Sequence, residues 1–179
     1  MKTLTDQLSQ YADYHRDPRN ILTHFFGVPM ILFAVVILLS RPAWALGDGL
    51  ALGGVPLSPA VIAAVLACSY YVLLDLRYGL AMGVVLAAML AVAAPLAQQA
   101  TAVWLGWGVG IFVVGWVIQF IGHYYEGRKP AFMDDIVGLL IGPLFVMAEM
   151  GFGLGLRREV QHAIEARSGP VRQRQASAS

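Results

Sequence analysis

Four long apolar runs dominate the chain, and short polar or glycine-rich segments separate them. The runs cover residues 21–40, 59–74, 78–96 and 101–122. About 20 consecutive apolar residues in a helix are enough to cross the roughly 30 Å hydrocarbon layer of a bilayer. The pattern therefore predicts an all-α integral membrane helical bundle of about four transmembrane helices, of which the second is rather short.

A weaker helical pattern precedes the first run. Apolar or aromatic side chains recur at helical spacing within residues 3–16, namely at Leu4, Leu8, Tyr11 and His15. This periodicity predicts an N-terminal amphipathic helix that lies on the membrane surface. Pro18 ends it, because proline disfavours helical backbone at the residue before it.

Glycine, proline and charged residues mark the connections between the runs. Residues 41–59 are rich in glycine and proline and are predicted to form a loop. Asp75 and Arg77 lie between two apolar runs and predict a tight, solvated turn.

A fifth apolar run, residues 136–156, contains Gly142 and Pro143 and is predicted to re-enter the membrane or to cross it as a fifth span. If it does not cross, eleven of the twelve Lys and Arg residues share one side; otherwise they divide equally. The positive-inside rule favours the first arrangement, with both termini cytoplasmic. Residues 1–156 are then a single membrane domain, followed by a basic, partly disordered tail at residues 157–179.

Composition supports a lipid environment. Hydrophobic residues make up 58% of the chain and charged residues 13%, against about 25% charged in average soluble domains. The net charge of +1 gives no indication of a nucleic-acid partner. The abundance of Ala, Gly and Leu and the short loops favour a bacterial inner membrane, or the endoplasmic reticulum if the protein is eukaryotic. The oligomeric state is not predicted.

The histidines supply the candidate chemistry. In the four-span arrangement His15, His24 and His123 all lie at the same membrane face, and Glu126 follows three residues after His123 on the same helix face. The break at Pro18 allows the N-terminal helix to fold back, which brings His15 towards His24. Two histidines and one carboxylate with open positions are typical of non-haem Fe(II) oxygenases.

Simpler interpretations stay open at this point. An isolated histidine at the membrane interface needs no ligand, and Glu126 can pair with Arg128 or Lys129 instead of a metal ion. A histidine-rich site also suits zinc. His162 lies in the polar tail and is not predicted to be a ligand.

Two motifs resemble those of the Mpo1-like family of membrane proteins. The first is HRDPRNILTHFFGVP at residues 15–29, and the second is QFIGH at residues 119–123, followed by Glu126, Arg128, Pro130 and Ala131. Both motifs are long and occur in the expected order, and the resemblance extends over residues 3–156.

This resemblance implies an Fe²⁺-dependent dioxygenase of fatty acid α-oxidation, which uses O₂ to shorten long-chain 2-hydroxy fatty acids by one carbon. The implied metal and catalytic residues are His15, His24, His123 and Glu126. The candidate substrate-binding residues near the acid head group are Asn20, Arg16, Arg128 and Tyr124. A non-enzymatic lipid-binding or scaffold protein and a zinc-dependent membrane enzyme are the alternatives. A transporter is disfavoured, because its ionisable groups would lie near the bilayer midplane.

Overall fold

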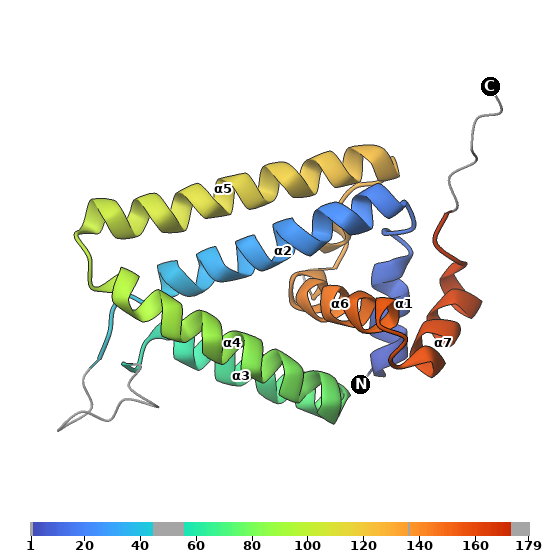
Figure 1. Cartoon of the computed structure of the whole chain (residues 1–179), viewed down its shortest axis with the longest axis horizontal. Helices are drawn as coiled ribbons and strands as arrows, with labels where there is room; N and C mark the ends of the chain where they lie inside the picture. Colours follow the sequence, from blue (N-terminus) through green and yellow to red (C-terminus); the bar gives the residue numbers. More distant parts are fainter. Residues whose placement is uncertain (1, 45–55, 136, 173–179) are drawn as a thin grey trace. The chain divides into compact units, whose positions relative to one another are not determined.

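The computed structural model describes residues 2–44, 56–135 and 137–172. Over these residues the chain is helical and contains no strand, so the predicted all-α class is confirmed (Figure 1). The elements are α1 (Leu4–Ala12), α2 (Pro18–Leu39), α3 (Pro59–Leu74), α4 (Leu76–Ala97), α5 (Thr101–Glu126), the short 3-10 helix η1 (Ala131–Met133), α6 (Gly138–Gly153) and α7 (Arg158–Ser168).

Local capping explains where several helices begin. The Thr3 hydroxyl accepts a hydrogen bond from the Asp6 amide while the Asp6 carboxylate accepts one from the Thr3 amide, which closes the first turn of α1. Asp75 is the single residue between α3 and α4, and its carboxylate accepts hydrogen bonds from the amides of Arg77 and Tyr78. The predicted tight turn at this position is confirmed.

Within the part of the chain that the structure describes, three helices are long and apolar enough to cross a membrane: α2, α4 and α5. At 16 residues α3 is about 24 Å long, shorter than the hydrocarbon layer, although its ends match the predicted run. A bend of 115° separates α6 from α7, and the pair would make a fourth span if counted as one. The bend lies between Gly153 and Arg158 and not at the predicted interruption, because α6 continues through Gly142 and Pro143. Either a broken span or a re-entrant loop has this geometry.

The chain divides into two compact units. One contains the residues up to Phe26 together with those from Ile118 onward, and the other contains Gly27–Val117. The second unit has its own core of Val36, Ile37, Ala60 and Ala93. A single membrane domain over residues 1–156 stays a prediction. Most of the predicted loop at residues 41–59, namely 45–55, lies outside the described residues.

Three helix boundaries in the first unit differ from those predicted from the sequence. Helix α1 stops at Ala12, because the amides of Tyr14 and His15 bond to the carbonyls of Tyr11 and Ala12 in tighter turns. The tail forms helix α7, and the residues from Gly169 to Arg172 also pack against the protein. Helix α5 continues four residues past Gly122 before Gly127, with φ 70°, ends it.

Candidate functional site

Three buried histidines converge in the first unit. His15 lies between α1 and α2, His24 lies on the second turn of α2, and His123 lies in the last turn of α5. Their exposed fractions are 0%, 2% and 6%, and one ring nitrogen from each lies within 4.8 Å of the others. The predicted convergence of these side chains is therefore present, as a group of nitrogens that could hold a metal ion.

Hydrogen bonds fix the tautomers of two of these imidazoles. Nδ1 of His15 lies 2.6 Å from the Tyr11 carbonyl oxygen, and Nδ1 of His24 lies 2.8 Å from that of Asn20. A carbonyl oxygen only accepts, so each Nδ1 carries the proton and donates it. In the neutral rings both Nε2 atoms then present lone pairs, and these two atoms face each other at 2.9 Å.

Two facing lone pairs repel unless a cation or a shared proton lies between them. Burial, and then the repulsion that a second protonated ring at His24 would exert, holds the pKa of His15 well below its ordinary value, so this imidazole stays neutral at physiological pH. A metal ion that binds imidazole at about 2.0–2.1 Å bridges nitrogens up to about 4.2 Å apart. The observed pair lies well within that limit, and the Nδ1–H···O=C bonds are the outer support typical of ligand histidines.

An aromatic wall encloses His15. The Tyr11 ring stacks on the imidazole with centroids 4.2 Å apart and planes within 2°, and Phe145 of α6 lies 5.5 Å from it. The sequence pattern indicated Tyr11 only as one of the positions at helical spacing in the N-terminal helix and indicated no role for Phe145. The four-residue spacing of Tyr11 and His15 is the signal that indicates the stack.

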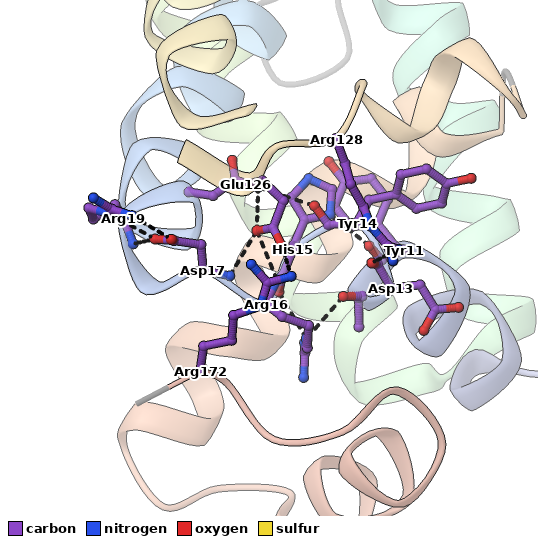
Figure 2. A network of polar contacts seen from close by, with 12 residues as sticks. Tyr11, Asp13, Tyr14, His15, Arg16, Asp17, Arg19, Glu126, Arg128 and Arg172 are labelled. Atoms are coloured by element: carbon purple, nitrogen blue, oxygen red, sulfur yellow. Dashed lines mark hydrogen bonds and ion pairs between the residues drawn. The ribbon is translucent and has the colours of Figure 1, made fainter. Parts of the chain in front are cut away.

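Glu126, predicted as a fourth ligand, lies outside the histidine group in the described structure. Its Oε2 accepts hydrogen bonds from the backbone amides of Arg16 (3.0 Å) and Asp17 (2.8 Å) (Figure 2). The same oxygen accepts a third hydrogen bond from Nδ2 of Asn20 at 3.1 Å. The two amides lie on the turn that joins α1 to α2, and Asn20 lies in the first turn of α2. The carboxylate therefore holds the segment that carries His15 against the end of α5.

Asn20 links this turn to the histidine group. Its Nδ2 also donates to the Tyr14 carbonyl at 3.2 Å, and its own carbonyl accepts from His24. Its buried Oδ1 has no hydrogen-bond partner among the described residues. Asn20 is thus well placed to orient His24, and it retains one free acceptor.

The predicted substrate-binding cations line one cleft. Arg16 and Arg128 border a solvent-open cleft of about 830 Å³, together with Asp13, Tyr14, Lys129, Asp134, Ser168, Pro170 and Arg172. Arg128 also donates from Nη1 to the Asp13 carbonyl at 2.7 Å. Tyr124 is not part of this lining and is 83% exposed. His162, not predicted as a ligand, lies exposed on α7.

Close helix approach makes Gly122 a sensitive position. A Cβ at Gly122 would overlap with the side-chain oxygens of Thr23 and Asn20 on α2. We expect Gly122→Ala to destabilise the protein by about 1–3 kcal/mol and to weaken metal binding, because it separates the helices that carry His24 and His123. Gly110→Ala, in the same helix with nothing within 4 Å, is the matched control. Thermal unfolding and metal titration in detergent check the difference, and equal behaviour of the two variants would contradict it.

The fold and the site together define a helical membrane protein with a buried three-histidine centre. The chain belongs to the Mpo1-like family: the family's sequence model, described as 2-hydroxy-palmitic acid dioxygenase Mpo1-like, matches residues 1–154. It is 34% identical over 175 residues to the 2-hydroxy-palmitic acid dioxygenase MPO1 of Saccharomyces cerevisiae, with 94% of each chain covered. No solved structure matches the chain. The predicted family is thus confirmed, and the relatives support a dioxygenase enzyme.

Proposed function

We propose that this protein is a membrane-bound dioxygenase that holds one Fe²⁺ ion through His15, His24 and His123 and shortens long-chain 2-hydroxy fatty acids by one carbon. The observation that carries the proposal is the pair of Nε2 atoms facing at 2.9 Å, with the third imidazole beside them. The relative in yeast is named as a dioxygenase of 2-hydroxypalmitic acid. In the proposed reaction, one 2-hydroxypalmitic acid and one O₂ are consumed, and one C15 fatty acid, one CO₂ and one water are formed.

Iron is proposed over zinc because of the chemistry required. The three histidines are borderline ligands that bind either ion, and Zn²⁺ has no redox chemistry. When bound, iron supplies the electron transfer that lets O₂ react with an organic substrate. The protein keeps His15 neutral by burial, orients two rings through backbone carbonyls, and shields the centre from water with Tyr11 and Phe145.

The substrate's head and tail have different requirements. The carboxylate needs cations, and Arg16 and Arg128 line the cleft beside the turn that carries His15. The free Oδ1 of Asn20 is an acceptor that suits the substrate hydroxyl. A contact from Tyr124 stays a prediction, because its side chain faces outward. The acyl chain is compatible with the apolar helices and the surrounding bilayer.

The proposed orientation places both termini and the histidine centre on the cytoplasmic side. Its support is the charge distribution of the four-span arrangement, in which eleven of twelve Lys and Arg residues share one side. The proposed compartment is a bacterial inner membrane, or the endoplasmic reticulum if the protein is eukaryotic. Cysteine-accessibility labelling at the two ends checks the orientation.

The direct test combines metal content with turnover. The full chain is purified in detergent without oxygen, bound iron and zinc are quantified, and 2-hydroxypalmitate and O₂ are added. About one iron per chain and a C15 product are expected. Stoichiometric zinc without turnover would retain the site and overturn the dioxygenase, whereas absence of any metal would favour a non-enzymatic lipid-binding or scaffold protein.

A further inference from the structure

The segment after α7 lies along the turn that carries His15. Gly169 ends α7 with φ 78°, and its carbonyl accepts a hydrogen bond from Nη1 of Arg16 at 2.8 Å. The amide of Arg172 donates to the Arg16 carbonyl, also at 2.8 Å. Both contacts come from residues beyond position 154, where the match to the family's sequence model ends.

The side chain of Arg172 reaches the carboxylate that organises this turn. Its Nη2 lies 3.3 Å from Oε1 of Glu126, as an ion pair without hydrogen-bond geometry (Figure 2). The Glu126 side chain is 0% exposed, whereas that of Arg172 is 55% exposed. A buried carboxylate is costly without a nearby cation, and its other oxygen is already occupied by the amides of Arg16 and Asp17.

We propose that Arg172 is a positioning residue for the histidine centre, an inference that rests on the proposed metal-binding function. Arg172 neutralises Glu126, and the charged carboxylate holds the amides of Arg16 and Asp17. These amides fix the turn, and the turn places Nε2 of His15 opposite that of His24. Arg172 touches none of the histidines, so it acts through Glu126.

The same tail offers a matched control. Nη1 of Arg167 pairs with Oδ1 of Asp6 at 2.5 Å, and the two side chains are 53% and 39% exposed. This pair ties α7 to α1, but it does not involve Glu126 or the His15 turn. Loss of Arg167 therefore loosens the tail without removing the cation from the buried carboxylate.

Hydrogen exchange of the metal-free full chain tests the coupling directly. In Arg172→Ala we expect the amides of Arg16 and Asp17 to exchange about tenfold faster than in the wild type, because local opening becomes easier. Arg172→Lys keeps a cation and should retain most of the protection, and Arg167→Ala should change it less than twofold. Equal acceleration in Arg167→Ala and Arg172→Ala, or none in either, would overturn the proposal.

Metal affinity gives the second measurement. Removal of an outer support of a metal site costs about 10–100-fold in affinity, so Arg172→Ala should bind Fe²⁺ or Co²⁺ at least about tenfold more weakly than Arg167→Ala. Normal affinity in Arg172→Ala would overturn the positioning role. If the wild type binds no metal, the proposed function fails, while the exchange measurement still decides whether Arg172 orders the turn.

Discussion

Replacing His24 with alanine is expected to remove the bound metal ion and the turnover together. The variant loses one of the three imidazoles within the 4.8 Å group and leaves the Nε2 of His15 without its partner. Loss of an outer-shell group already costs 10–100-fold, so loss of a ligand should reduce metal affinity and activity by more than about 100-fold. Metal analysis and C15 product formation in detergent measure both quantities.

The other histidines provide the comparison. His15→Ala and His123→Ala should behave like His24→Ala, because each contributes one nitrogen to the group. His162→Ala should keep full metal content and turnover, since His162 is exposed on α7 outside the group. A folded His24→Ala protein that retained stoichiometric iron would contradict the assignment of the centre, as would a loss in His162→Ala.

Most of the helices could be predicted because membrane-length apolar runs leave few alternatives. The run at residues 59–74 matches α3 at both ends, since Pro59 suits the first helical turn and Asp75 caps the next helix. Helix α7 in the C-terminal tail was harder to predict from the sequence. Residues 158–168 are polar, and their helix is supported by contacts with distant residues, such as Arg167 with Asp6 and Ser168 with Ser9. Contacts between residues so far apart in the sequence cannot be predicted from the composition of the helix itself.

The histidine centre was predictable for a topological reason, and its supports were not. Helices that return the chain to one face bring His24 and His123 together, and the break at Pro18 lets His15 join them. The three-residue spacing of His123 and Glu126 shows a shared helix face, but it does not show what lies opposite each side chain. Opposite Glu126 lie the backbone amides of Arg16 and Asp17. Every residue except proline has such an amide, so the residue types in the sequence do not show which amides will face the carboxylate.

Glu126→Ala is the second substitution with a large expected effect. It leaves the amides of Arg16 and Asp17 and the Nδ2 of Asn20 without their shared acceptor. Each buried unsatisfied donor costs about 1–3 kcal/mol, so we expect a loss of at least about 3 kcal/mol in the free energy of unfolding. The displaced His15 should also weaken metal binding. Chemical denaturation in detergent and metal titration measure the two effects.

Glu126→Gln separates a positioning carboxylate from a metal ligand. The amide keeps an oxygen of similar position for the donors on the turn but removes the charge, so we expect a smaller loss of about 1–2 kcal/mol and most of the metal retained. A carboxylate ligand behaves differently, because a neutral amide binds Fe²⁺ more weakly and both variants would then lose the ion alike. Equal metal loss in Glu126→Gln and Glu126→Ala, with Glu126→Gln still folded, would therefore restore Glu126 as the fourth ligand predicted from the sequence.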